Sequence, residues 1–272
     1  MLEWNRKEEA AGIVRFIRAR LSLLVMAFLF GNLIAVVFTA LEPSGADLRS
    51  ETYTYQKTTT QNGVKLHALR TRPNNIVLKH IQSNVTLTDE FGINGGFFWN
   101  GDLLSIAVVN DQPLVGQQWD YGSGWYNIDV PKGTLVWDEI TGSFSVQVAI
   151  DAEQLHVTDK GHYWAQGGVS MSLQHDEQWV QQALAEDMPA FAEARLRSGA
   201  VYDKSQNLWL LVSETPCTVE QFRTAAIEWV GRTQVVDGVF LDGDGSSQMR
   251  SAQIQLKGDT REVYQMLALK KK

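Results

Sequence analysis

Hydrophobic residues are distributed differently before and after residue 42. Residues 21–41 contain no charged side chain, and their apolar residues would fall on every face of a helix. A helix needs about 20 residues to cross a hydrocarbon core, and a buried soluble helix is rarely apolar all round for so long. The pattern predicts one transmembrane helix at residues 21–41. A cleaved signal peptide is the alternative, but its apolar core usually has only about 7–15 residues.

From residue 52 onward, short apolar or alternating runs are separated by residues that favour turns. Alternation with a period of two is typical of half-buried strands, and Gly, Pro and Asn between the runs indicate hairpins. The expected strands cover residues 64–69, 75–81, 103–109, 134–136 and 144–150. The pattern therefore predicts a domain that is rich in strands.

Two stretches show helical spacing instead. The first covers residues 176–184, with further helical potential up to Leu196. The second begins after Thr218, which with Gln221 forms a predicted capping box, and it ends at Gly231. The predicted fold class is therefore α+β: a β-rich domain of mixed sheets with flanking helices, preceded by one transmembrane helix.

Charge differs between the two sides of the apolar stretch. Residues 1–20 carry a net charge of +2, which leaves −9 for the rest of a chain with −7 overall. Basic flanks stay in the cytoplasm, so we expect a single-pass membrane protein with a cytoplasmic segment at residues 1–20. A linker at residues 42–60 would precede a periplasmic or extracellular domain at residues 61–272. The acidic charge of that domain argues against a nucleic-acid partner.

The most informative polar segment follows the apolar residues 238–241. It reads Asp242, Gly243, Asp244, Gly245, Ser246 and Ser247. Glycines let the backbone approach a ligand closely, and carboxylates and hydroxyls suit a polar substrate. A polar surface turn is the alternative. A calcium-binding EF-hand loop fails, because it requires Gly and Glu where the chain has Ser247 and Gln253.

Several patches, taken in order along the chain, resemble the phosphodiester glycosidase family, whose members remove a sugar from a sugar-1-phosphodiester. The patches are Asn94-Gly95-Gly96-Phe97, Gln166-Gly167-Gly168, Arg197-Ser198-Gly199, Ser213-Glu214-Thr215-Pro216, Leu241-Asp242-Gly243-Asp244-Gly245-Ser246-Ser247 and Arg261-Glu262-Val263. The family usually has Leu-Asp-Gly-Gly-Gly-Ser at the fifth patch, so Asp244 stands here in place of a glycine. The resemblance spans about residues 60–270.

The resemblance implies an exported hydrolase that cleaves a sugar-1-phosphodiester in an envelope or extracellular glycan. Asp242 would be the acid/base or nucleophile, with Glu214 as a second carboxylate. Arg197 would hold the phosphate, because a guanidinium presents a fork of donors to phosphate oxygens. The expected substrate-binding residues are Asn94, Gly95, Gly96, Gly167, Gly168, Gly243, Asp244, Gly245, Ser246 and Ser247. The expected partners are therefore a glycan or sugar phosphate and, through residues 21–41, a membrane.

Two other functions stay open, because Asp244 adds a negative charge two residues from Asp242. The domain is alternatively a glycan-binding or assembly module without catalysis, or a cation-dependent phosphodiesterase. No cofactor is expected apart from a divalent cation near Asp242 and Asp244. Zinc is not expected, because the histidines lack ligand spacing and Cys217 is the single cysteine. Glu214 has an alternative role as a charge at a helix entry.

Overall fold

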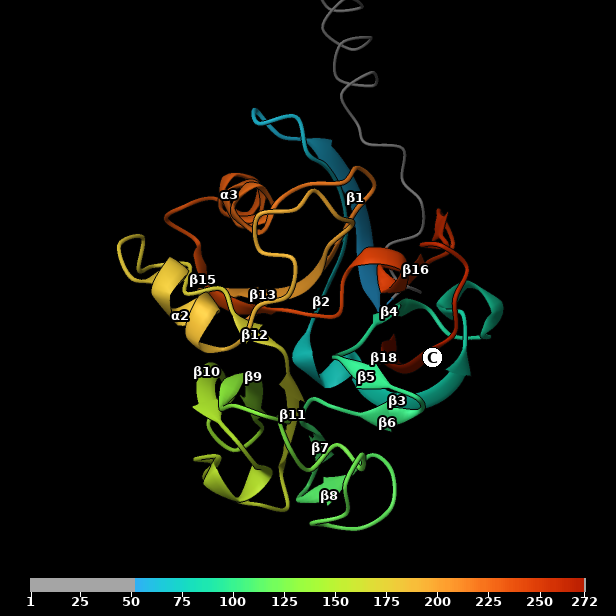
Figure 1. Ribbon diagram of the computed structural model, residues 1–272, viewed down its shortest axis with the longest axis vertical. Helices are drawn as coiled ribbons and strands as arrows, with labels where there is room; N and C mark the ends of the chain where they lie inside the picture. Colours follow the sequence, from blue (N-terminus) through green and yellow to red (C-terminus); the bar gives the residue numbers. More distant parts are fainter. Residues whose placement is uncertain (1–51, 272) are drawn as a thin grey trace, which may run out of the picture. The chain divides into compact units, whose positions relative to one another are not determined.

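The computed structural model describes residues 52–271, which form one compact unit. Its centre is a six-stranded sheet, and two five-stranded sheets and one hairpin complete the β structure of this part of the chain. Every ladder between named strands in residues 52–271 is antiparallel. Figure 1 shows how these sheets and the helices α2 and α3 are arranged.

The six-stranded sheet is the central sheet on which the other elements pack. Its spatial order is β1 (Tyr53–Thr59), β2 (Lys65–Thr71), β14 (Leu208–Ser213), β13 (Ser198–Asp203), β15 (Val235–Phe240) and β12 (Val169–Ser170). All residues of β14 and β13 are buried. Such continuous burial means that both faces of these central strands are covered.

One face of this sheet packs on the two helices. They are α2 (Trp179–Ala185) and α3 (Val219–Val230), and Trp179 and Phe222 enter the same core cluster as Leu211 and Phe240. The predicted capping box is present: the Thr218 hydroxyl accepts from the Gln221 N–H, and the Gln221 side chain accepts from the Thr218 N–H. The helix predicted from Thr218 to Gly231 is therefore confirmed.

The other face packs on the two five-stranded sheets, and Leu210 and Val212 point into this second core with Trp137 and Leu267. One sheet has the order β10 (Ser143–Ala149), β9 (Lys132–Asp138), β11 (Tyr163–Gly167), β7 (Ala107–Val109) and β8 (Gln112–Pro113). The other has β17 (Gln255–Leu256), β16 (Met249–Arg250), β4 (Gly92–Asn94), β18 (Val263–Leu269) and β3 (Ile76–Ser83). The hairpin is β5 (Phe98–Trp99) with β6 (Asp102–Leu103).

The predicted fold class is wrong in two respects. The described residues are mostly antiparallel β-sheet with two α-helices, so "α+β" overstates the helices and "mixed" misdescribes the sheets. Parallel ladders need long crossover connections, whereas most strands here are joined by short turns. In residues 52–271 no helix has the length and apolarity to cross a membrane. The expected segments at 1–20 and 21–41 lie outside the described residues.

Two predicted boundaries also shift. Strand β1 occupies residues 53–59 of the predicted linker at 42–60, because these residues pair with β2 along the edge of the sheet. The helical potential up to Leu196 is not realised. Helix α2 ends at Ala185, and positive φ angles at Asp187 (53°) and Ala190 (49°) lead the chain away from helical geometry on either side of Pro189.

Candidate functional site

The polar segment that follows β15 lies where two sheets meet. The Asp242 N–H donates to the Gly95 carbonyl at 3.2 Å, and the Asp242 carbonyl accepts from Asn94 Nδ2 at 2.8 Å. Asn94 ends β4, so these bonds join the six-stranded sheet to a five-stranded one. The chain then forms a single 3-10 turn at Asp244–Ser246, and Asp244 has a φ of 52°. The turn exposes Asp244 and buries Ser246.

The Asn94 side chain holds this segment by hydrogen bonds. It is buried, and its amide uses both ends: Nδ2 donates to the Asp242 carbonyl, while Oδ1 accepts from the Ser198 hydroxyl and the Gln248 N–H. These bonds account for most of its hydrogen-bonding capacity. The structure therefore places Asn94 as a residue that positions Asp242, and Asn94 is not among the residues that line the cavity described next.

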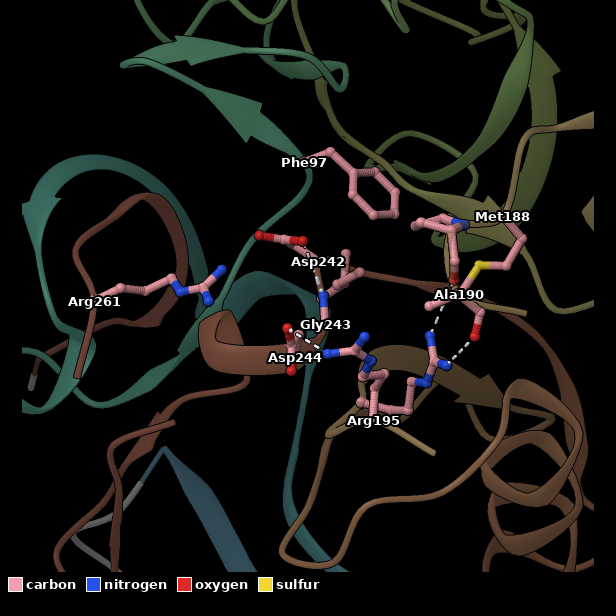
Figure 2. Close-up of a pocket in the computed structure, with 11 residues that line it drawn as sticks. Phe97, Met188, Ala190, Arg195, Asp242, Gly243, Asp244 and Arg261 are labelled. Atoms are coloured by element: carbon pink, nitrogen blue, oxygen red, sulfur yellow. Dashed lines mark hydrogen bonds and ion pairs between the residues drawn. The ribbon is translucent and has the colours of Figure 1, made fainter. Parts of the chain in front are cut away.

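A cavity of about 230 Å³ opens above Asp242. Four of its lining residues belong to the predicted set: Arg197, Asp242, Gly243 and Asp244. Sequence reasoning did not place the others there; they are Phe97, Met188, Pro189, Ala190, Arg195, Leu241 and Arg261. Figure 2 shows Arg261 and Arg195 reaching toward the segment of Asp242 and Asp244 from different parts of the chain.

The Asp242 carboxyl is poorly solvated. Burial is the largest cause of a pKa that is raised from 3.8 to about 6. The Ser246 hydroxyl, the Gly243 N–H and Arg261 act in the opposite direction but do not outweigh it. A carboxyl with a pKa near 6 is present in both protonation states at near-neutral pH, as general acid/base catalysis requires.

Two exposed arginines supply positive charge to the cavity. Arg195 pairs with Glu193 at 2.6 Å and with Asp244 at 3.4 Å. Arg261 pairs with Asp259 at 2.5 Å, and its charge lowers the pKa of Asp242. Both guanidinium groups are exposed to solvent, so an anionic ligand can approach them in competition with these carboxylates. The sequence patches included Arg261, but nothing in its neighbours indicated that it faces Asp242.

Arg197 is arranged differently from the predicted phosphate ligand. It is 3% exposed, and its guanidinium donates to four backbone carbonyls, those of Cys217, Pro189, Ala190 and Glu193. Burial lowers its pKa. Pro189 and Ala190 line the cavity, so the contacts of Arg197 hold this part of the cavity lining in place.

Glu214 lies away from Asp242. Its carboxylate pairs with His67 Nε2 at 3.1 Å, and the other His67 nitrogen bonds the Tyr55 hydroxyl at 2.8 Å. Glu214 lines a different, polar cavity together with Lys57 and Lys65. The structure therefore does not bring the two predicted catalytic carboxylates together. Asp244 is the carboxylate that shares the cavity with Asp242.

Close packing explains most of the predicted binding glycines. A Cβ at Gly168 would lie 2.1 Å from the Phe240 carbonyl oxygen, and one at Gly245 would lie 2.1 Å from the Asp259 carboxylate. Gly95, Gly96 and Gly167 meet neighbours at 2.4–2.6 Å in the same way. Gly243 is the glycine of this set that lines the cavity.

Ser246 and Ser247 are buried. Ser246 is near enough to Asp242 to lower the pKa of its carboxyl. Within residues 52–271, however, neither serine hydroxyl makes a hydrogen bond of good geometry. Neither serine is among the residues that line the cavity. In the same part of the chain, no group of three or more His, Cys, Asp or Glu side chains is arranged to hold a metal ion.

No family model and no curated protein matches the chain. Solved structures do. The zebrafish N-acetylglucosamine-1-phosphodiester alpha-N-acetylglucosaminidase catalytic domain, auto-inhibited by its pro-peptide, is 12% identical, with 83% of this chain and 85% of that chain covered and a TM-score of 0.55. A hypothetical protein from Synechocystis is 12% identical, with 79% and 61% covered and a TM-score of 0.46. The zebrafish domain confirms the predicted resemblance at the level of the fold.

Proposed function

We propose that this chain is a hydrolase that cleaves a sugar-1-phosphodiester, with Asp242 as general acid. The observation that carries the proposal is a poorly solvated carboxyl, with a pKa of about 6, in a cavity that two exposed arginines also line. The fold adds support, because the similar zebrafish domain is named for action on an N-acetylglucosamine-1-phosphodiester.

Four charged side chains of the cavity have a part in the proposed reaction. Asp242 gives its proton to the oxygen that bridges the sugar and phosphorus as the C1–O bond breaks, and the bond electrons stay on that oxygen. Asp244 takes a proton from the water that attacks C1, which provides the second of the two carboxyls that glycoside hydrolysis typically uses. Arg195 and Arg261 stabilise the negative charge of the phosphate.

This assignment differs from the sequence prediction at two residues. Asp244 replaces Glu214 as the second carboxylate, because Asp244 lines the Asp242 cavity and Glu214 lines another. Arg195 and Arg261 replace Arg197 at the phosphate, because Arg197 is buried and four of its five N–H groups donate to backbone carbonyls, whereas Arg195 and Arg261 are exposed. Asp244, which stands where the family pattern has a glycine, is thereby proposed as the general base.

Cleavage of a synthetic sugar-1-phosphodiester in ¹⁸O-labelled water tests the proposal. We expect the label in the released sugar and a loss of turnover of about a hundredfold or more in Asp242→Asn, the lower range for general acid/base catalysis. Label in the phosphate would instead show P–O cleavage by a phosphodiesterase. Saturable binding without any product would show a glycan-binding module.

A further inference from the structure

A second cavity adjoins the one at Asp242. Phe97 and Pro189 line both cavities, and the second has a volume of about 220 Å³. Each alone is smaller than the roughly 300–1,000 Å³ of a typical ligand pocket, whereas the two together fall within that range. A ligand that occupies both would therefore pass across Phe97 and Pro189.

Lys132 brings a buried positive charge to this second cavity. The residue begins β9, is 8% exposed, and its Nζ donates to the Ile128 carbonyl at 3.1 Å. Within residues 52–271 no carboxylate lies within 4.0 Å of this ammonium, and the bond to Ile128 is its single hydrogen bond. An ammonium carries three donors, so two are left for a ligand. A donor that stays unpaired in a buried position is unfavourable.

The rest of the cavity decides which ligand suits these donors. Phe98, Leu104 and Ile128 provide apolar walls, and the exposed Asp129 and Asp187 complete the lining. Burial lowers the pKa of Lys132, and the charges of Asp187, Asp129 and Glu186 act in the opposite direction, so these three carboxylates lie within electrostatic range of the ammonium. Three carboxylates around one ammonium make an anionic ligand unfavourable.

We infer that the Lys132 cavity is a subsite for an uncharged, hydroxyl-rich group with an apolar face, such as a pyranose ring. Its hydroxyls accept from Lys132 and donate to Asp129 or Asp187, while the ring face packs on Phe98. The inference rests on the proposed function, since it assigns this ring to the alcohol that remains on the phosphate after cleavage. Lys132 is then a specificity-determining residue that lies outside the reacting atoms.

Two substrates with the same sugar-1-phosphate test the subsite. In one the second alcohol is a hexose, and in the other it is methanol. We expect Lys132→Met, which keeps the side-chain stem, to lower kcat/KM for the hexose diester relative to the methyl diester by about tenfold, as expected for a lost hydrogen bond to a charged group. Lys65→Met, in the separate cavity of Glu214, is the matched control and should leave this ratio unchanged.

A second variant covers the case in which Lys132→Met does not fold. Ile128→Trp fills the cavity without removing a charge and should lower the same ratio. An equal loss for both diesters, or an unchanged ratio in both variants, would overturn the inference. A higher kcat/KM of the wild-type protein for a hexuronate diester than for the hexose diester would also overturn it, because the carboxylates of the cavity disfavour an anion there.

Binding separates this inference from the proposed function. Calorimetry with hexose 6-phosphate should show binding to the wild-type protein and at least tenfold weaker binding to Lys132→Met. If the protein cleaves neither diester but binds the hexose phosphate through Lys132, the proposed function fails and the subsite stands. If it cleaves both diesters with equal kcat/KM, the function stands and the subsite fails. Neither cleavage nor binding would overturn both.

Discussion

The side-chain amide of Asn94 donates a 2.8 Å hydrogen bond to the backbone carbonyl of Asp242. Asn94 ends β4 in one sheet, and Asp242 follows β15 in another. The bond therefore fixes the position of a carboxyl-bearing residue between two separate sheets. This hydrogen bond explains the need for an asparagine at residue 94 without any contact with a ligand.

The first prediction concerns Asn94→Ala. The substitution leaves the Asp242 carbonyl, the Ser198 hydroxyl and the Gln248 N–H without this partner in a buried place. We expect the free energy of unfolding to fall by about 2–4 kcal/mol, because unpaired buried groups are each unfavourable by about 1–3 kcal/mol. Urea denaturation measures it, and turnover of the diester should fall as well.

Asn62→Ala is the matched control for that experiment. Asn62 is exposed, and its Nδ2 donates to the Gln221 carbonyl at 2.9 Å. This variant should change the stability by less than about 1 kcal/mol and leave turnover intact. An Asn94→Ala protein that is as stable as wild type, yet no longer binds substrate, would show that Asn94 contacts the ligand as the sequence predicted.

The second prediction separates Arg197 from Arg195. Arg197→Met removes the donors that hold the carbonyls of Pro189, Ala190 and Glu193. We expect a loss of about 2–4 kcal/mol in stability and faster hydrogen exchange in residues 187–195, because the wall of the cavity loses its anchor. Thermal denaturation and exchange mass spectrometry measure these effects.

Arg195→Met should behave in the opposite way. Arg195 is exposed, so its loss should leave the unfolding midpoint unchanged and raise KM for the diester. Unchanged stability in Arg197→Met together with a large rise in KM would instead restore Arg197 as the phosphate ligand.

The third prediction concerns the second carboxylate. Asp244→Asn should lower kcat by about tenfold or more, because Asp244 shares the Asp242 cavity. Glu214→Gln should leave kcat unchanged, because Glu214 pairs with His67 in a separate cavity. Steady-state kinetics on the same diester measure both. The reverse result would show that Glu214 reaches the substrate and would remove Asp244 from the mechanism.

Local patterns predicted the parts of the fold that depend on neighbouring residues. The capping box of Thr218 and Gln221 is a contact over three positions, and the alternation in residues 144–150 reflects the period of a strand that the structure has at Ser143–Ala149. The strand before Asp242 is likewise visible as an apolar run, and the structure has it at Val235–Phe240. Such features are complete within a short window of sequence.

The candidate site depends instead on contacts between distant parts of the chain. Arg195 and Arg197 are two positions apart, yet one is exposed and the other is held by four carbonyls. Arg261 lines the same cavity as Asp242 although the two are 19 positions apart in the sequence. Glu214 looked suitable because it follows a buried strand, but local sequence does not say which cavity a strand end faces. Sequence alone therefore located Asp242 and could not choose its partners.

The fourth prediction concerns the pH dependence that Asp242 imposes on activity. A general acid must be protonated, and the pKa of this carboxyl lies near 6. We therefore expect kcat/KM for the diester to fall as pH rises above about 6, tenfold for each pH unit well above the pKa. A pH–rate profile measures this, and a profile that stays flat from pH 5 to 8 would contradict the role of Asp242 as the acid.

The same carboxyl also makes stability depend on pH. Its pKa is about 6 in the folded protein against 3.8 as the reference for the unfolded chain, so between about pH 4 and pH 6 the folded state keeps a proton that the unfolded state has lost. Stability from this group is thus highest below about pH 4 and declines as pH rises to about 6. A shift of about two pKa units corresponds to about 3 kcal/mol as an upper value. Asp242→Asn cannot ionise, so its stability relative to wild type should rise by about 1–3 kcal/mol between pH 4 and pH 7.

Asp203→Asn is a control in which the stability relative to wild type should change with pH in the opposite direction. Burial raises the pKa of Asp203, but hydrogen bonds from Asn207 and Trp209 outweigh it, so the pKa is lowered overall. Its carboxylate stabilises the fold above the unfolded pKa of 3.8, and that contribution is lost as pH falls through the lower folded pKa. The Asp203→Asn variant should therefore lose stability relative to wild type as pH rises to about 4, whereas Asp242→Asn gains stability between about pH 4 and pH 7. Urea denaturation compares the two, with Asp203→Asn measured at about pH 2 and about pH 4 and Asp242→Asn at about pH 4 and about pH 7. A shared sign would show that Asp242 is not held in a poorly solvated position.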